Sequence, residues 1–585
     1  MLLKRSSVLV GSVAVAVGLA LTQPLTAAAQ PGGDTLVTVG SPTTPFPQNK
    51  QNEPAVAIDA HAPTVLVAGA NDEIDLAPCR GTDCPFTPGV GLSGVYFSFD
   101  GGASWVQPTY TGWTARTGTP GVGPIGTLPW YYENGLVSGG DPAVAFGPRL
   151  VNGQFSWANG SRLYYANLAS NFSSGAFRGA EALAVSRTDD PQAAAAGDKD
   201  AWLPPVIVSR QNSALFSDKE QVWADNAASS PFFGNVYICN VAFRSRGSGA
   251  PEPVMVARST DAGSTWTQRQ ISEATNNGQT GGRQGCSLRT DSRGVLYVSW
   301  LGTDIQTRSS AHFLARSFDG GRTFTRAQLV TLVNGPGAVD PVQGRFVLDG
   351  NAGARADLAP APSIDIANGA PTGTAAPNTI VDTWNDGDRD VSRALVISSG
   401  DGGQTWTAPS DATEGADRAM YSAIAISPHG SDVYLVYDAF LQGFQTTTAA
   451  PRLMQGVMRH ANVTGSTVGA WGTLHRGAVG DARGSSANSL VAEFLGDYNY
   501  AAATDTYGTA VWNDVRRAAD CPAIDAYRQA LITAALSTGG PLVSGKDDGE
   551  APTEALGDRP APLADCPPGF GNSDIYGGSY DDPTP

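Results

Sequence analysis

Lysine and histidine are scarce in this chain of 585 residues, and charged residues of all kinds make up only 16% of it. Five of its 37 basic residues are lysines, and it has five histidines. Helical bundles and coiled coils need far more Glu, Lys and Leu, so the composition argues against both. With so few histidines and no Cys-x-x-Cys pair, a zinc site is not expected.

Three catalytic signatures are also missing. The chain has no Gly-x-Ser-x-Gly, no His-Glu-x-x-His and no Gly-x-x-x-x-Gly-Lys-Ser/Thr. These motifs mark serine hydrolases, zinc peptidases and phosphate-binding loops, so none of these activities is expected. The formal net charge of −17 would repel phosphate backbones, which excludes nucleic acid as an expected partner.

Glycine, proline and aromatic residues are abundant instead: 70 Gly, 40 Pro, 20 Phe, 17 Tyr and 12 Trp. This composition is typical of many short strands joined by tight turns, and it predicts an all-β protein. Because 41% of the residues are hydrophobic, the chain can bury a large core.

The N-terminus has the pattern of a secretory signal. Lys4 and Arg5 precede an apolar run from Val8 to Leu21, and the small residues Ala27 to Ala29 form a cleavage site. We therefore expect residues 1–29 to be a signal peptide and the protein to be secreted and extracellular. A membrane anchor is the alternative, but the run is short, so stable membrane insertion is not expected. Removing these two positive charges from −17 leaves −19 for the mature chain.

One short motif of the form Ser-x-Asp-x-Gly-x-Thr/Ser-aromatic recurs four times. The Asp carboxylate can accept backbone N–H groups, and Gly allows a positive φ, as a tight turn between two strands requires. Apolar runs precede the copies and are expected to be strands. The copies are Ser98-Phe-Asp-Gly-Gly-Ala-Ser-Trp105, Ser259-Thr-Asp-Ala-Gly-Ser-Thr-Trp266, Ser317-Phe-Asp-Gly-Gly-Arg-Thr-Phe324 and Ser399-Gly-Asp-Gly-Gly-Gln-Thr-Trp406.

This motif resembles the Asp-box, or bacterial neuraminidase repeat, of sialidases and related β-propellers. The resemblance implies a β-propeller in which these turns lie at the periphery, away from the catalytic face. It therefore implies structural roles for Asp100, Asp261, Asp319 and Asp401.

A second repeat, out of phase with the first, consists of a strand, a turn and another apolar strand. Its first strands end at seven anchors separated by 88, 78, 66, 74, 62 and 78 residues: Asp59, Gly147, Asp225, Asp291, Asp365, Ser427 and Asp505. Two strands here and two around the Asp-box make one four-stranded blade. We predict a seven-bladed propeller over residues 34–537, with six blades as the alternative because sialidase domains usually have six. Residues 35–39 are expected to close the ring, and the Gly-, Pro- and Asp-rich tail 538–585 to dock in part.

Six cysteines in an exported chain predict disulfides. Cys79 and Cys84 are close enough for a local loop. From the repeat register we expect Cys239 to bridge to Cys286 between neighbouring blades, and Cys521 and Cys566 to hold the tail on the last blade.

Propeller topology brings the loops before each first strand and after each second strand to one face. A sialidase-like site has a tyrosine nucleophile, a carboxylate activator, an acidic general acid/base and arginines that bind the substrate carboxylate. The candidates for catalysis are Asp141, Glu220, Tyr421 and Tyr498, and the candidates for substrate binding are Arg283, Arg389, Arg418 and Arg516. For each of them, capping of a blade is the alternative role.

The resemblance implies a secreted sialidase-like glycoside hydrolase that acts on extracellular glycans, with retention of configuration if it is a true sialidase. The Phe/Tyr-Arg-Ile-Pro segment of sialidases is absent before the first Asp-box. The alternatives are a propeller polysaccharide lyase and a non-catalytic propeller that binds carbohydrate or protein. We expect a monomer whose partner is a glycan, without a cofactor or metal; calcium at the oxygen-rich segment Asn385–Asp390 is the alternative to a solvated turn there.

Overall fold

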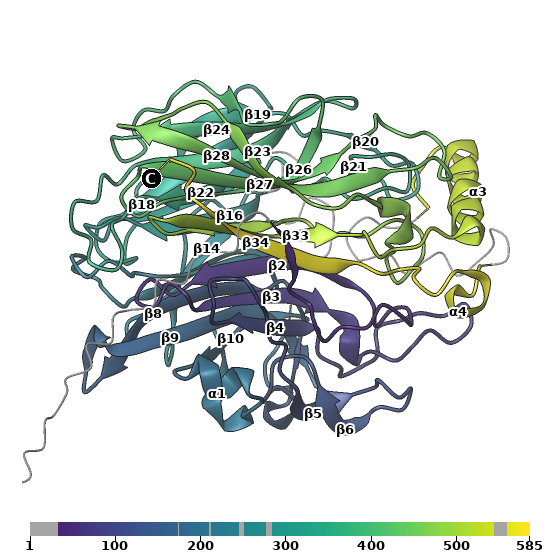
Figure 1. The fold of residues 1–585 in the computed structure, drawn as a ribbon, viewed down its shortest axis with the longest axis horizontal. Helices are drawn as coiled ribbons and strands as arrows, with labels where there is room; N and C mark the ends of the chain where they lie inside the picture. Colours follow the sequence, from purple (N-terminus) through teal and green to yellow (C-terminus); the bar gives the residue numbers. More distant parts are fainter. Residues whose placement is uncertain are drawn as a thin grey trace, which may run out of the picture.

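A computed structural model describes residues 33–584, except 173–174, 210–211, 214, 245–250, 276–282 and 543–558. The predicted signal peptide lies outside the described residues. The chain forms a β-propeller of seven blades around one axis (Figure 1), which confirms the predicted fold and the count of seven rather than six.

Antiparallel pairing orders the strands of each blade from the axis outward. The first three blades consist of β2 (Gln51–Ile58), β3 (Leu66–Asp72) and β4 (Ser93–Ser98); of β8 (Ala143–Val151), β9 (Gln154–Asn171), β10 (Ala182–Thr188) and β11 (Trp202–Ile207); and of β12 (Phe216–Ala224), β13 (Val236–Phe243), β14 (Val254–Ser259) and β15 (Thr267–Gln270). In blade 1 a single bridge between Phe97 and Val106 takes the place of a fourth strand.

Blades 4 to 6 repeat this arrangement. They consist of β16 (Gln284–Thr290), β17 (Leu296–Thr303), β18 (Ser310–Ser317) and β19 (Gln328–Val333); of β22 (Ser363–Ile366), β23 (Ile380–Gly387), β24 (Ser392–Ser399) and β25 (Ser410–Asp411); and of β26 (Arg418–Ile426), β27 (Asp432–Phe440) and β28 (Leu453–Thr464), on which β29 (Thr467–Val468), β30 (Gly472–Arg476) and β31 (Gly480–Asp481) pair.

Blade 7 joins the two ends of the chain. It consists of β32 (Tyr500–Ala503), β33 (Tyr507–Asp514), β34 (Asp574–Asp581) and β1 (Thr35–Leu36). The strand β1 pairs with β34 as the outermost strand, which is the closure expected from residues 35–39. The propeller does not end at residue 537, however, because β34 from the expected tail is the third strand of this blade. The tail is thus part of the sheet as well as a docked segment.

Helices and short ribbons decorate the ring. The described helices are α1 (Pro191–Ala195), α3 (Pro522–Thr538) and α4 (Pro562–Asp565), with 3-10 turns η1 (Glu73–Asp75), η2 (Tyr132–Asn134), η3 (Lys199–Ala201) and η4 (Ala482–Gly484). The extra strands are β5 (Tyr110–Thr114) with β6 (Gly121–Ile125), β7 (Leu136–Ser138) beside β9, and β20 (Ala338–Val339) with β21 (Phe346–Val347). None of the described helices has both the length and the apolar character needed to cross a membrane.

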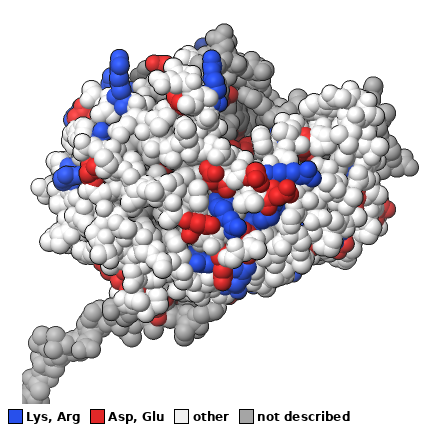
Figure 2. All heavy atoms as spheres, turned by 90° about the horizontal axis from the view of Figure 1, so that it is seen from above, with Lys and Arg blue, Asp and Glu red and all other residues white. Residues whose placement is uncertain are grey.

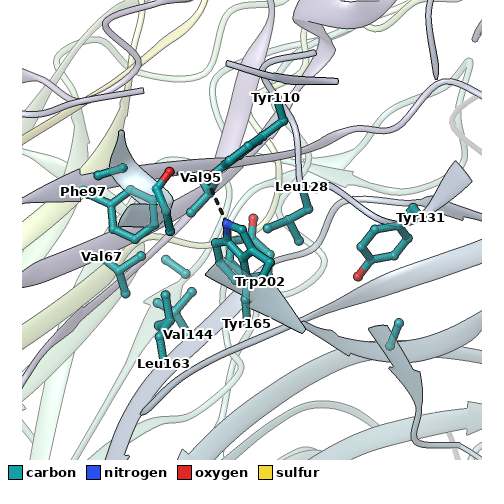
Figure 3. Packing of buried hydrophobic residues seen from close by; sticks show 14 of the residues in the cluster. Val67, Val95, Phe97, Tyr110, Leu128, Tyr131, Val144, Leu163, Tyr165 and Trp202 are labelled. Carbon is teal, nitrogen blue, oxygen red and sulfur yellow. Dashed lines mark hydrogen bonds between the residues drawn. The ribbon is translucent and has the colours of Figure 1, made fainter. Parts of the chain in front are cut away.

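The core lies between the blades. Figure 3 shows the contact of blades 1 and 2, where Val67 and Phe97 pack against Leu163 and Tyr165. The side chain of Trp202 closes this cluster. Because each blade packs on both faces, strands such as β13 and β27 are buried along their whole length and read as nearly continuous apolar runs.

All four Ser-x-Asp repeats adopt the same hydrogen-bonded turn after the third strand of their blade. In the copy at Asp319, Oδ1 accepts from the Ser317 hydroxyl and the Thr323 N–H at 2.9 and 2.8 Å, and Oδ2 accepts from the Thr323 hydroxyl at 2.6 Å. The Gly321 N–H donates to the Ser317 hydroxyl at 2.8 Å. The equivalent bonds recur at Asp100, Asp261 and Asp401. These carboxylates are occupied in shaping the turn.

The three disulfides are those predicted. They join Cys79 to Cys84, Cys239 to Cys286 and Cys521 to Cys566. The second links β13 of blade 3 to β16 of blade 4, and the third links the start of α3 to the end of α4. The first disulfide closes a loop after η1, the second joins two neighbouring blades, and the third joins the two helices of the C-terminal part.

Candidate functional site

The first strands of several blades share a backbone irregularity at the end nearest the pocket described below. Glu53, Asp141, Lys219 and Tyr421 have φ of 53°, 51°, 56° and 55°. In blades 1, 3 and 6 the strand register shifts at this point, which is the mark of a β-bulge. A left-handed conformation costs a non-glycine residue on the order of 1–3 kcal/mol, and such residues cluster at functional sites. This shared geometry marks one end of the propeller axis.

A pocket of about 1180 Å³ opens at this end of the axis. Its floor includes Glu53 of β2 and Lys219 of β12, together with Asp141 just before β8 and Asp497 just before β32. Its walls come from the loop around the Cys79–Cys84 disulfide, the segment from β21 to β22, residues 488–494 and Arg559. The Ser-x-Asp turns lie at the other end of their blades, because three antiparallel strands separate them from the start of the first strand.

Lys219 is the central cation of the floor. Its Nζ lies 2.7 Å from Oδ2 of Asp497, 3.2 Å from Oδ2 of Asp141 and 3.6 Å from Oε1 of Glu53. Arg355 pairs with two of the same groups: its Nη2 donates to Glu53 Oε1 at 2.8 Å, and its Nε lies 2.8 Å from Asp497 Oδ1. Two cations and three carboxylates thus form one buried, alternating network.

The carboxyl groups of this network differ in pKa. Burial, repulsion by Asp141 and a hydrogen bond that protonated Glu53 donates to Asp141 raise the pKa of Glu53 to about 8, although Lys219 and Arg355 oppose the rise. Burial would also raise the pKa of Asp497, but the charges of Arg355 and Lys219 outweigh it and hold the pKa well below its ordinary value. At neutral pH the floor therefore holds protonated Glu53 beside the ionised Asp497.

Gly496 allows this close arrangement. Its φ is +80°, and a Cβ there would lie 2.1 Å from Cγ of Glu53. Any side chain would push the segment that carries Asp497 away from Glu53, so the network depends on glycine at this position.

A smaller cavity of about 80 Å³ lies beside the network and is lined by Lys219, Glu220, Tyr421 and Tyr498, among others. Glu220 is 6% exposed, and neither of its carboxylate oxygens has a hydrogen-bond partner among the described residues. Burial and the nearby Asp141 raise the pKa of Glu220 well above its ordinary range. The pKa of Tyr498 is also raised, by burial and by the charges of Asp141 and Glu53.

The four catalytic candidates from the sequence therefore gather around the axis. Asp141 lies on the pocket floor, while Glu220, Tyr421 and Tyr498 border the smaller cavity. The hydroxyl of Tyr421 donates to the backbone carbonyl of Arg355 at 2.8 Å, so it supports that arginine.

The four arginines named as substrate ligands are not brought together, and none of them lines the pocket. Arg418 is buried and donates to the carbonyls of Leu348 and Arg389, each at 2.7 Å. Arg516 pairs with Asp34 and Asp514 at 2.5 and 2.7 Å. In both cases the guanidinium is already bound to other acceptors of the protein. The predicted cluster of arginines that converge on the pocket is therefore wrong.

The other two arginines point elsewhere. Arg283 donates to the Thr275 hydroxyl at 3.0 Å, on the segment after β15. The exposed guanidinium of Arg389 lies over the ring of Phe444, 4.7 Å from its centroid. Arg283 precedes β16 and Arg389 follows β23, so both lie at the expected end of their blades. The position of a residue relative to a strand does not, however, determine the direction of a long side chain.

The cations of the site, Lys219 and Arg355, are not among the site residues predicted from the sequence. Lys219 directly precedes the candidate Glu220. It occupies the same position relative to its blade as Glu53 and Asp141 do, and this repeat position could have identified it as a site residue. Arg355 lies between β21 and β22, and Arg345 lies between β20 and β21, where it pairs with Asp357 at 2.5 Å. Both segments are outside the repeat pattern. No periodic signal in the sequence points to them.

The segment Asn385–Asp390 forms a hydrogen-bonded turn. Oδ1 of Asp388 accepts from the N–H groups of Asp390 and Val391, each at 2.9 Å. Oδ2 of Asp386 accepts from the N–H of Asn334 and from the Trp384 indole, each at 2.9 Å. Asp388 thus shapes the turn after β23, and Asp386, at the end of β23, binds the neighbouring segment that carries Asn334.

No protein-family model matches the sequence, and a search of curated proteins finds no relative. Solved structures with a similar fold include a Hadza microbial sialidase (13% identity, TM-score 0.34), Trypanosoma rangeli sialidase (12%, 0.36) and the intramolecular trans-sialidase from Ruminococcus gnavus (11%, 0.38). The matches cover 63%, 68% and 69% of this chain and 62%, 53% and 94% of those proteins. The chain thus spans less than two thirds of the first two. At these values the site has to be argued from its own residues.

Proposed function

We propose that this protein is an exported glycoside hydrolase that acts on extracellular glycans at the axial pocket. The observation that carries the proposal is the pair of carboxyl groups on the pocket floor, Glu53 and Asp141, which lie 3.6 and 3.2 Å from Nζ of Lys219. Hydrolysis of a glycosidic bond uses two carboxyl groups about 5 Å or more apart, one that gives a proton to the leaving oxygen and one that acts as base or nucleophile. Because Glu53 and Asp141 hydrogen-bond each other, the proposal requires the sugar to separate them when it binds.

In this mechanism Glu53 donates its proton to the glycosidic oxygen as the bond to the anomeric carbon breaks. The Asp141 carboxylate either removes a proton from the attacking water or attacks the anomeric carbon itself. Lys219, 3.2 Å from Asp141, orients that carboxylate and balances the charge that appears when Glu53 loses its proton. Arg355 holds Glu53 in place, and Tyr421 holds Arg355.

The test is turnover by the purified mature protein of fluorogenic glycosides, including a sialoside, and release of reducing ends from polysaccharides. We expect Glu53→Gln and Asp141→Asn each to lower kcat/KM by about 100-fold or more, the usual effect of losing a general acid or base. Asp390→Asn, the same substitution at an exposed carboxylate remote from the pocket, serves as the matched control. Circular dichroism and a thermal melt establish that each variant is folded.

Two other outcomes have distinct signatures. Ultraviolet absorbance of an unsaturated uronate product would indicate a polysaccharide lyase. Glycan binding without any product would indicate a binding propeller. Either result would contradict the hydrolase proposal.

A further inference from the structure

Two exposed phenylalanines face the pocket from separate segments. Phe86 is 43% exposed and lies two residues after Cys84, just outside the loop that the Cys79–Cys84 disulfide closes. Phe346 is 42% exposed and begins β21. Both line the pocket. A single exposed Phe needs no explanation, but two at one polar pocket are typical of a surface that a ligand covers.

The cations of the pocket are already engaged. Lys219 and Arg355 share the floor carboxylates, Lys50 lies 3.1 Å from Glu73, and Arg345 pairs with Asp357. The fifth cationic group, Arg559, donates to the carbonyl of Asn488 at 3.3 Å. Among the described lining residues, these five face eight carboxyl groups.

An acidic sugar would therefore meet an excess of negative charge. At four of these five cations, binding its carboxylate would require breaking an existing ion pair, since the donors that would bind a carboxylate are already used there. On the face drawn in Figure 2, too, acidic and basic side chains lie next to one another rather than in a patch of one sign. Neutral hydroxyl groups, in contrast, can donate to these carboxylates without repulsion.

The volume of the pocket points to more than one sugar ring. At about 1180 Å³ it exceeds the roughly 300–1,000 Å³ of most small-molecule sites. The apolar C–H face of a sugar ring can pack on an aromatic ring, while its hydroxyls reach polar groups, so exposed Phe beside carboxylates suits such a ligand.

We propose that the pocket takes a neutral oligosaccharide chain, with sugar rings packed on Phe86 and Phe346, rather than a sialic acid or a uronate. This inference rests on the proposed function only in assuming that a glycosidic bond of the bound chain is hydrolysed. Binding of the chain can be measured without turnover.

The experiment measures binding to the Glu53→Gln variant by calorimetry. The neutral probes are hexasaccharides of β-glucan, xylan, mannan, galactan and arabinan, and the acidic probes are hexamers of sialic acid and galacturonic acid. We expect at least one neutral probe to bind, and Phe86→Ala and Phe346→Ala each to weaken it about five- to tenfold. Phe318→Ala is the matched control, because Phe318 is 63% exposed on a Ser-x-Asp turn and does not line the pocket.

Because Glu53→Gln alters a group on the floor of the pocket, the wild-type protein is measured with the same probes under conditions where product is also monitored. Neutral binding that depends on both phenylalanines supports the inference even if no product forms, in which case only the hydrolase proposal fails. Tighter binding or turnover of an acidic probe overturns the inference and leaves a hydrolase possible as a class. Neutral binding unaffected by both substitutions, or no binding to any neutral probe, also overturns it.

Discussion

At the scale of single residues, Glu53 sets the pH range in which the proposed chemistry can run. Its pKa is raised to about 8 because it is buried beside Asp141. A general acid works only while protonated, so kcat/KM for a fluorogenic glycoside should fall about tenfold per pH unit above this pH. A pH–rate profile checks this, and a rate that stays constant through pH 9.5 would contradict the role of Glu53.

Asp225, at the far end of blade 3, predicts a pH-dependent stability. It is fully buried, and one of its oxygens accepts from the Ser230 hydroxyl at 2.6 Å. Burial raises its pKa to about 7 despite that hydrogen bond. The unfolded chain loses this proton first, so the folded state loses stability as pH rises from about 4 to 7.

Asp225→Asn should remove this loss. We expect it to raise the free energy of unfolding by about 1–3 kcal/mol at pH 8, the range for the desolvation penalty of a buried polar group, and to change it little at pH 4. Urea denaturation at both values measures the difference. An equal effect at the two pH values would show that Asp225 is not the titrating group.

At the scale of the element, the Ser-x-Asp turn closes the outer hairpin of its blade. Asp319 accepts hydrogen bonds from Ser317, Arg322 and Thr323, which lower its pKa to about 2 against a partial desolvation. Because the turn is largely solvated, Asp319→Ala should lower the free energy of unfolding by only about 1–2 kcal/mol. Glycan binding at the opposite end of the blade should not change.

Chemical denaturation and calorimetry on the same variant measure both quantities, with Asp390→Ala as the control for loss of an exposed carboxylate. Weakened glycan binding in folded Asp319→Ala would mean that the working face has been placed at the wrong end of the propeller.

At the scale of the whole molecule, the disulfides should stabilise the ring unequally. Cys521–Cys566 closes a loop of 45 residues, whereas Cys79–Cys84 closes one of 5. Chain entropy predicts that replacing the first pair by serine costs roughly 4 kcal/mol and the second roughly 2 kcal/mol. Denaturation of the two double variants gives the comparison. A larger loss at Cys79–Cys84 would instead indicate that its loop packs cooperatively with the pocket wall.

The blades and their turns could be predicted because their signals are local. In each Ser-x-Asp turn the hydrogen bonds join residues at most four positions apart, so the motif carries its own geometry. The spacing of the anchors from Asp59 to Asp505 then counts the blades, since each blade repeats one supersecondary unit. Register along these units also placed Cys239 opposite Cys286 and put Asp141 at the axis.

The pairing of charges depended on the folded molecule. Arg355 lies 302 positions from Glu53 in sequence, in a segment without repeat register, yet donates to it at 2.8 Å. Arg418 and Arg516 occupy the expected strand ends but turn to nearer acceptors. The third strand of blade 7 likewise comes from the tail, past residue 570. Hydrophobic period and turn chemistry follow neighbours along the chain, whereas a long charged side chain pairs with whatever the fold brings within about 4 Å.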